Sequence, residues 1–310
     1  MKKVLVLMST YNGEKYIKEQ LDSIFLQESV NVYCSIRDDG STDATQEIIN
    51  DYATHNSKIN FLKGDNVGWA QSFYSLVENN RYSDYDYYAF SDQDDVWESN
   101  KLISAIQKLE ELDSRKPLLY CSNLKVVDNN LNWVSEQYMF SKVNLSKEHA
   151  LVESFSTGCT QVFNHKMKDL YLIYKPYYLH AHDYWLYLVG TFIGQVIYDD
   201  NAYIKYRQHY NNVKGAGTGL WELWKKRIKL LSKQYLKEKL NQHPVEYMAQ
   251  ELLKGYSVYI NEMDIKTVET VALYRQNLWT KLVLFLSFDI RRISFSANLG
   301  LRIRILLGIA

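Results

Sequence analysis

The feature that most constrains the fold is a regular alternation of short apolar runs and amphipathic segments over residues 1–112. The apolar runs predict four strands, at Val4–Met8, Val32–Ile36, Ile59–Leu62 and Tyr87–Phe90. Apolar residues at helical spacing predict four helices, near Ile17–Ile24, Ile48–Tyr52, Trp69–Val77 and Lys101–Leu112. Strands that alternate with helices in this way are typical of an α/β fold, in which helices cover both faces of a mostly parallel sheet.

Three polar clusters directly follow predicted strands. They are Ser9–Gly13, Arg37–Asp43 and Ser91–Asp95. In parallel α/β sheets, ligands bind outside the carboxyl ends of the strands, where the following loops meet. We therefore expect these three clusters to form one ligand-binding edge.

The chain changes character in its last third. A glycine-rich stretch, Gly215–Gly219, precedes two apolar stripes at helical spacing among lysines and arginines. The third glycine of this stretch comes one residue too early for a dinucleotide-binding loop, so we interpret the stretch as a linker. The sequence therefore predicts two parts, an α/β domain over residues 1–214 and a helical region over residues 215–310.

The net charge of zero conceals an asymmetry between these two parts. Residues 1–214 hold 21 Lys and Arg against 28 Asp and Glu, whereas residues 215–310 hold 15 against 8. In the tail, Arg291, Arg292, Arg302 and Arg304 alternate with apolar residues. Such a segment is typical of a contact with an anionic membrane surface, and equally of a helix that forms a homo-oligomer or packs against another domain. The tail lacks a recognisable nucleic-acid-binding motif, so we do not expect nucleic acid as a partner.

Hydropathy and cysteine usage indicate the compartment. No apolar run approaches the roughly 20 residues that a membrane-spanning helix needs. The three cysteines, Cys34, Cys121 and Cys159, are odd in number and lack metal-ligand spacing, which indicates buried thiols in a reducing environment. The sequence thus predicts a cytoplasmic protein.

The strongest local signal is the acidic run Ser91–Asp95, which places three carboxylates within four residues after an apolar strand. Such close like charges repel one another unless a cation neutralises them, and Mg²⁺ or Mn²⁺ prefers oxygen ligands of this kind. The alternative is a solvated acidic turn. In Arg37–Asp43, an aspartate could accept hydrogen bonds from a nucleobase or a ribose. Alternatively, Asp38 and Asp43 merely cap the next helix and Gly40 makes the turn. Ser41 or Thr42 also suits the N-cap of that helix.

Two further polar runs allow more than one interpretation. In His180–Trp185, two histidines and Asp183 suggest a zinc site, a helix cap or a general base at the start of a helix, but no third zinc ligand stands at a familiar spacing. In Tyr206–His209, Arg207 could pair with a phosphate and His209 could complete a metal site, and a solvated loop is the alternative. The absence of a G-x-S-x-G elbow and of a P-loop argues against α/β-hydrolases and P-loop enzymes.

The order of these motifs along the chain resembles that of inverting glycosyltransferases of family two, which have the GT-A fold. The residues that carry the resemblance lie within about residues 1–212 and are Ser9–Gly13, Asp38–Asp43, Asn66–Gly68, Asp92–Asp95 and His182–Asp183. The segments that look like the rhamnosyltransferase branch, which builds bacterial surface polysaccharides, are Ser91–Trp97, His182–Trp185 and Tyr206–His209.

The resemblance implies a role for each matched residue. A nucleotide-sugar donor would be bound by Thr10, Tyr11, Asp38, Asp39, Asn66, Gly68, Asp92 and Arg207. Mg²⁺ or Mn²⁺ would be held by Asp94, Asp92 and His209. The acceptor side would be lined by Gly158, Cys159, His182 and Trp185. Asp183 would be the base that takes the proton from the acceptor hydroxyl.

The activity that the resemblance implies is transfer of L-rhamnose from dTDP-rhamnose to a hydroxyl of a growing, polyprenyl-diphosphate-linked glycan at the inner face of the cell membrane. A cation stabilises the diphosphate leaving group and a carboxylate takes the proton, so the reaction needs no enzyme nucleophile. One alternative is a transferase of the same fold that uses a UDP-hexose. Another is a non-catalytic nucleotide-sugar-binding subunit of a polysaccharide assembly complex.

Overall fold

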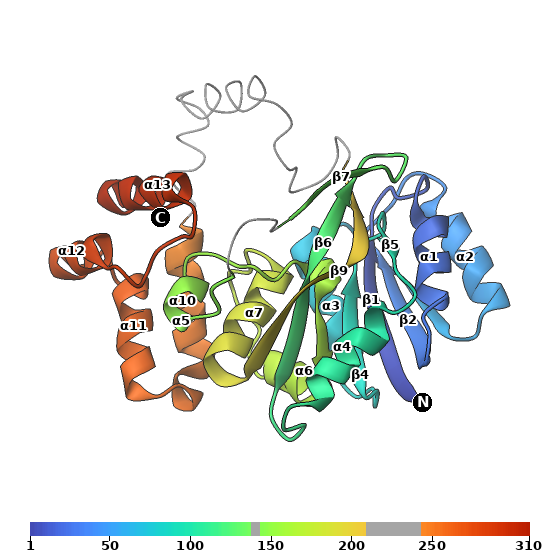
Figure 1. Cartoon of the computed structure of the whole chain (residues 1–310), viewed down its shortest axis with the longest axis horizontal. Helices are drawn as coiled ribbons and strands as arrows, with labels where there is room; N and C mark the ends of the chain where they lie inside the picture. Colours follow the sequence, from blue (N-terminus) through green and yellow to red (C-terminus); the bar gives the residue numbers. More distant parts are fainter. Residues whose placement is uncertain (138–142, 209–242) are drawn as a thin grey trace. The chain divides into compact units, whose positions relative to one another are not determined.

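The computed structural model describes residues 1–137, 143–208 and 243–310, which divide into two compact units (Figure 1). The first unit comprises Met1–Leu145, Ser154–Lys175 and Leu179–Arg207. The second unit comprises Ser146–Glu153, Pro176–Tyr178 and Gln208–Ala310. The predicted domain boundary near residue 215 and the predicted linker Gly215–Gly219 lie outside the described residues.

Among its described residues, the first unit contains a nine-stranded mixed sheet. Its strands are β1 (Lys2–Thr10), β2 (Val30–Asp38), β3 (Ile59–Lys63), β4 (Tyr87–Ser91), β5 (Val96–Trp97), β6 (Leu118–Val127), β7 (Trp133–Glu136), β8 (Val162–Asn164) and β9 (Gln195–Arg207). Their spatial order is β3-β2-β1-β4-β8-β6-β9-β5, and β7 pairs with β6. Strands β1 to β4 run parallel, as the alternating pattern predicts.

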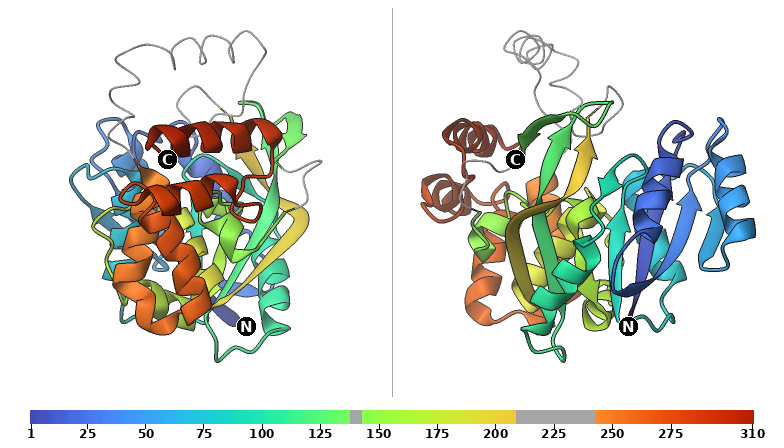
Figure 2. Two further views of the ribbon diagram at one scale, coloured as in Figure 1. Left: turned by 90° about the vertical axis from the view of Figure 1, so that its left-hand side faces the viewer. Right: turned by 45° about the vertical axis from the view of Figure 1, so that its right-hand side comes forward.

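Helices cover both faces of this sheet. They are α1 (Ile17–Phe25), α2 (Thr45–His55), α3 (Trp69–Asn79), α4 (Lys101–Glu110), α6 (His165–Tyr171) and α7 (His182–Ile193), with the 3-10 helix η1 (Gly158–Thr160). Apolar residues of α1, α2 and α4 pack with Val4, Val6 and Met8 of β1 on one face. Helices α3, α6 and α7 pack against the strands from the other side (Figure 2). The predicted α/β fold is confirmed.

The register of the central strands positions the candidate site. Thr10 at the end of β1 pairs with Asp38 at the end of β2, and Met8 pairs with Ser91 at the end of β4. Because the strands are parallel, the loops that follow them leave the sheet side by side. The three polar clusters of the sequence therefore share one edge of the sheet.

The second unit is helical. Its elements are α5 (Lys147–Ala150), α10 (Pro244–Tyr256), η2 (Ser257–Tyr259), α11 (Glu262–Ala272), α12 (Leu278–Leu286) and α13 (Phe295–Leu307). Helices α12 and α13 lie side by side (Figures 1 and 2). The prediction of C-terminal helices is confirmed for residues 243–310. None of the helices in the described part of the chain combines the length and the hydropathy that a bilayer crossing requires.

Candidate active site

The loops after β1 and β2 are tied together by hydrogen bonds between backbone and side chains. The N–H of Asn12 donates to the Ser41 hydroxyl (2.9 Å), and the N–H of Thr42 donates to the side-chain oxygen of Asn12 (2.8 Å). The N–H of Gly13 donates to the Thr45 hydroxyl (2.7 Å). These contacts set the shape of this part of the edge from within the protein.

Asp38 lies fully buried beneath these loops. Its carboxylate accepts hydrogen bonds from the Thr10 hydroxyl (3.1 Å), from the Ser41 N–H (2.8 Å) and from the Gln46 side chain (2.7 Å). Asp38 therefore stabilises the turn from within the protein, and Thr10, itself buried, supports it. The predicted N-cap at Ser41 or Thr42 is wrong, since α2 begins at Thr45 and its N-cap residue is Ala44.

Asp39 fastens the loop after β3. Its carboxylate forms a buried ion pair with Arg37 and accepts hydrogen bonds from the N–H groups of Val67 (3.0 Å) and Gly68 (2.9 Å). Gly68 has a positive φ of 83°, which glycine adopts without strain, and the neighbouring Asn66 is exposed. Sequence reasoning missed Arg37, although a cation beside consecutive aspartates was a usable signal.

The acidic turn is clamped to the β1 loop by Gln93. The side-chain oxygen of Gln93 accepts from the Tyr11 N–H (2.9 Å), and its side-chain nitrogen donates to the Tyr11 carbonyl (3.0 Å). A Cβ atom at Gly13 would lie 2.3 Å from Oε1 of Gln93, so a larger residue there would displace the clamp. Sequence reasoning considered the carboxylates of this turn and missed Gln93. Tyr11 is half-exposed at the outer edge of the site.

Arg207 braces the same turn from the end of β9. Its guanidinium donates to the carbonyls of Asp94 (3.0 Å) and Asn129 (2.6 Å) and pairs with the Glu19 carboxylate. Its backbone N–H donates to Asp95 (3.1 Å), and the side chain is buried. Its guanidinium nitrogens thus donate to protein groups, and contact between Arg207 and the donor stays a prediction.

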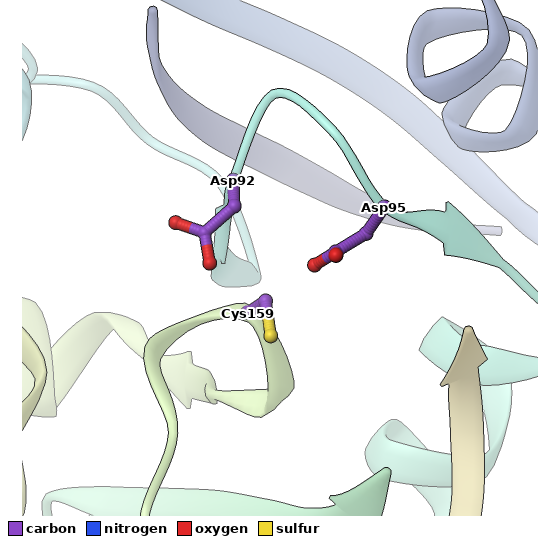
Figure 3. A group of neighbouring side chains, drawn as sticks. All are labelled: Asp92, Asp95 and Cys159. Atoms are coloured by element: carbon purple, nitrogen blue, oxygen red, sulfur yellow. The ribbon is translucent and has the colours of Figure 1, made fainter. Parts of the chain in front are cut away.

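Asp92, Asp95 and Cys159 form the candidate metal site, and their potential ligand atoms all lie within 4.8 Å of one another (Figure 3). Burial, together with the charges of Asp94 and Asp92, raises the pKa of Asp95 well above its usual value. Burial, together with the negative charges of Asp95 and Asp92, raises the pKa of the Cys159 thiol. The predicted ligand Asp94 is not in this group, and His209 lies outside the described residues.

The carboxylates of this group are suitable ligands for a hard divalent cation. The Oδ2 atom of Asp95 is buried, and no nitrogen or oxygen donor among the described residues bonds to it. A cation there would relieve the repulsion between Asp92 and Asp95. The thiol of Cys159 is a poorer ligand for Mg²⁺ or Mn²⁺ than the carboxylates are, so the two aspartates would carry the binding.

A buried lysine lies behind this turn. Lys101 is almost fully buried, and its Nζ lies 3.6 Å from the centroid of the Trp97 ring. Burial lowers the pKa of Lys101 to about 7, against the opposing influence of Cys159 and Asp95. Sequence reasoning missed this residue, because a lysine at the start of an amphipathic helix usually faces solvent.

Asp183 is joined to the acidic turn through Gly158 and Cys159. One carboxylate oxygen of Asp183 accepts from the Gly158 N–H (3.0 Å) and the other from the Tyr184 N–H (2.8 Å). A Cβ atom at Gly158 would lie 3.0 Å from Nε2 of His182 and 3.3 Å from Cβ of Asp183, which is why glycine suits this position. Cys159, the next residue, belongs to the candidate metal site.

The side chains of His182 and Trp185 are both buried. The His182 ring stacks on Phe73, with centroids 3.8 Å apart, and meets the edge of Trp69 at 5.6 Å. The Trp185 side chain is fully buried, so it has no exposed surface for the acceptor here, and its acceptor role stays a prediction. In the described part of the chain, the grouped metal-ligating side chains include neither His180 nor His182, so the zinc interpretation has no support.

The chain matches a known family over just over half of its length. The family model described as Glycosyl transferase family 2 matches residues 5–169, from β1 through the acidic turn to α6. The chain is similar to dTDP-rhamnosyl transferase RfbG of Shigella flexneri, with 31% identity over 253 residues that cover 74% of this chain and 81% of that protein. It is also similar to the uncharacterised glycosyltransferase RT0329 of Rickettsia typhi, with 26% identity over 239 residues that cover 74% and 73% of the two chains.

Among solved structures, the chain is similar to S. aureus TarS residues 1–349 in complex with UDP-GlcNAc. The TM-score is 0.59 at 20% identity, and the match covers 98% of this chain and 81% of that one. Likeness at this identity shows the fold, and it agrees with the GT-A fold that the motifs implied. The family match, together with the identity to RfbG, confirms the predicted enzyme class: this chain belongs to glycosyltransferase family 2.

Proposed function

We propose that the protein is a metal-dependent inverting glycosyltransferase in which Asp183 is the general base. The observation that carries this proposal is the short link between two acidic groups that are far apart in sequence. The Gly158 N–H holds the Asp183 carboxylate, and the adjacent Cys159 lies with Asp92 and Asp95. One donor molecule could therefore meet the metal-binding aspartates and the base at the same time.

The surroundings of Asp183 suit a base. Its two hydrogen bonds to N–H groups orient the carboxylate and use two of about four lone-pair sites, which leaves the others for the acceptor hydroxyl. A positioned base of this kind contributes about 10²- to 10⁴-fold to a rate. Attack by the acceptor oxygen from the side opposite the diphosphate inverts the anomeric carbon.

Asp92 and Asp95 would hold Mg²⁺ or Mn²⁺, with Asp94 close by on the same turn. When bound, the cation would act as a Lewis acid that stabilises the charge of the diphosphate leaving group. Gln93 and Arg207 hold the turn in place for this purpose. Asp38 and Asp39 would contribute to donor binding by fixing the loops that carry Tyr11, Asn66 and Gly68.

The similarity to RfbG supports dTDP-rhamnose as the donor, whereas a UDP-hexose is the alternative. A hydroxyl of a growing lipid-linked surface glycan would be the acceptor. An enzyme with this acceptor would work at the inner face of the cell membrane, and Gly158 would lie on the acceptor side of the site.

The test is nucleotide release from a donor panel that includes dTDP-rhamnose and UDP-hexoses, with Mg²⁺, with Mn²⁺ and with a chelator. Asp183→Asn should lower kcat by about 10²- to 10⁴-fold with the donor KM little changed, because the carboxylate acts on the acceptor. Asp51→Asn, on the exposed surface of α2, is the matched control and should retain full activity. Unimpaired transfer by Asp183→Asn would show that another group is the base.

The other parts of the proposal have their own outcomes. Asp92→Asn should raise the concentration of Mg²⁺ or Mn²⁺ needed for half-maximal activity. Full activity of the wild type in chelator would refute metal dependence. Turnover of a UDP-hexose without turnover of dTDP-rhamnose would reassign the donor and leave the base assignment standing.

A further inference from the structure

Helix α13 has apolar side chains on two opposite faces. Leu301 and Ile305 are its buried residues. The exposed apolar residues of α13 are Phe295, Leu299, Ile303, Leu306 and Leu307. At 3.6 residues per turn these five lie within an arc of about 120°, opposite the buried pair. A helix that only covered a core would present polar residues on this outer face.

Helix α12 repeats the pattern. Leu284 is its buried residue. The exposed apolar residues of α12 are Leu278, Trp279, Leu282, Val283 and Leu286. They lie within an arc of about 140°. We call the exposed apolar residues of α12 and α13, with Phe288 between the helices, the α12–α13 surface; Phe288 and Phe295 are both 85% exposed.

Arg302 fixes the two helices to each other. Its guanidinium donates to the carbonyls of Leu284 and Ser287 at the end of α12 and to the carbonyl of Ile290 (3.1 Å). Burial, and then the charge of Arg291, lowers the pKa of Arg302 from its ordinary value. The α12–α13 surface is therefore held by internal contacts of the second unit.

The charges around this surface select its partner. Residues 278–310 contain five basic side chains, Lys281, Arg291, Arg292, Arg302 and Arg304, and one acidic side chain, Asp289. By helical geometry, Arg304 flanks the exposed stripe of α13 on one side. Arg302, on the other side, is already engaged by backbone carbonyls. Arginine beside an apolar stripe can keep its charge at a lipid headgroup while its carbon chain lies along the apolar surface.

Three kinds of partner can be compared on these grounds. A nucleic acid would pair with the cations but would leave the apolar side chains of α12 and α13 in water. A second copy of this chain would cover the apolar side chains but would bring the same five cations of each copy together. An anionic lipid surface satisfies both requirements, because acyl chains receive Leu, Phe and Trp while the headgroups meet Lys and Arg.

We propose that the α12–α13 surface docks on an anionic lipid bilayer, lying in its interface. This inference deepens the proposed function, since a lipid-linked acceptor would be presented at that interface. Docking needs neither donor nor catalysis, so it is tested separately. Asp183→Asn should bind vesicles as the wild type does, whatever its transferase activity.

The experiment is flotation of the full chain with vesicles of phosphatidylcholine that contain about 30 mol% phosphatidylglycerol, and with vesicles of phosphatidylcholine alone. The wild type should float with the anionic vesicles. The double variant Trp279→Ser/Phe295→Ser, which removes one aromatic residue from each helix, should bind them at least about tenfold more weakly. A control, Tyr82→Ser/Val258→Ser, removes two hydrophobic residues elsewhere that are at least as exposed, and it should bind as the wild type does.

A variant with fewer cations separates the electrostatic contribution to vesicle binding from the apolar one. Lys281→Gln/Arg291→Gln should weaken binding to anionic vesicles by about tenfold or more and should remove much of its salt dependence. Circular dichroism of each variant establishes that it is folded.

Two results would overturn the proposal. The first is a folded wild type that fails to float with anionic vesicles, or that floats equally well after Trp279→Ser/Phe295→Ser. The second is a dimer or larger oligomer by light scattering that dissociates in this double variant without any vesicle binding, which would identify a second copy as the partner.

Discussion

The two units of this protein use polar and apolar side chains in opposite ways. At the sheet edge of the first unit, charged groups such as Asp38, Asp39 and Arg207 are buried and bonded to other protein groups. In α12 and α13 of the second unit, large apolar groups are exposed. Buried, satisfied charges hold a defined geometry, whereas exposed apolar surface marks a contact still to be made. The comparison separates loops that the chain holds by its own contacts from the surface for which we propose a lipid partner.

The largest expected effect tests this comparison by replacing one arginine in each unit with methionine. Arg207→Met should lower the free energy of unfolding by about 3 kcal/mol, since it removes a buried guanidinium with its ion pair to the half-exposed Glu19 and leaves the Asp94 and Asn129 carbonyls without their donor. Arg291→Met, at an exposed position, should change it by less than about 0.5 kcal/mol. Urea denaturation followed by circular dichroism measures both.

The outcome for Arg207 also decides between bracing and donor binding. A raised donor KM with unchanged unfolding free energy would contradict the bracing role and support the prediction that Arg207 contacts the donor. Loss of stability together with a lower kcat would support the role in holding the acidic turn.

Two glycines give a smaller but sharper contrast. Gly13→Ala should lower the free energy of unfolding by about 1–2 kcal/mol. The new methyl group displaces the Gln93 side chain and breaks its two hydrogen bonds to Tyr11. Gly300→Ala in α13 should instead stabilise by about 0.5–1 kcal/mol, since nothing lies within 4 Å of the added atom and alanine favours the helix. Thermal denaturation of both variants tests the pair, and equal shifts of one sign would contradict it.

The smallest expected effect concerns pH and the second unit. Burial, and then the charge of Arg275, lowers the pKa of His243 from its ordinary value of 6.5. As pH falls through that value, the unfolded chain binds a proton before the folded chain does, so His243 should reduce stability by at most about 1.4 kcal/mol per pH unit. In His243→Gln, the urea midpoint should therefore change less between about pH 7.5 and about pH 5.5 than it does in the wild type.

A second titratable group close to His243 acts on stability in the opposite direction. Arg275 lies 2.9 Å from the His243 ring and pairs with Glu246, whose pKa is raised by burial. A raised carboxyl pKa favours the folded state as pH falls, which opposes the effect of the histidine. An identical pH dependence in wild type and His243→Gln would show that Glu246, and not His243, dominates.

Much of the fold could be predicted from the sequence because the first unit repeats one simple pattern. The strand β1 reads as the apolar run Val4–Met8 since helices bury both of its faces. The acidic turn stood out because it directly follows β4, and Asp183 stood out because it opens α7. Patterns of this kind depend on local spacing, which a sequence displays directly.

The sequence by itself thus determined the order of strands and helices, the edge at which the polar loops gather, and the family to which the chain belongs. Only the tertiary structure decided that Asp95 and Cys159 join Asp92, that Gln93 and Arg207 hold the turn, that Trp185 is inaccessible, and that α12 and α13 expose a second apolar face. The physical reason is that element order follows from periodicity along the chain. Burial and hydrogen-bond partners arise between residues that are distant in sequence, and neighbouring residues carry no record of them.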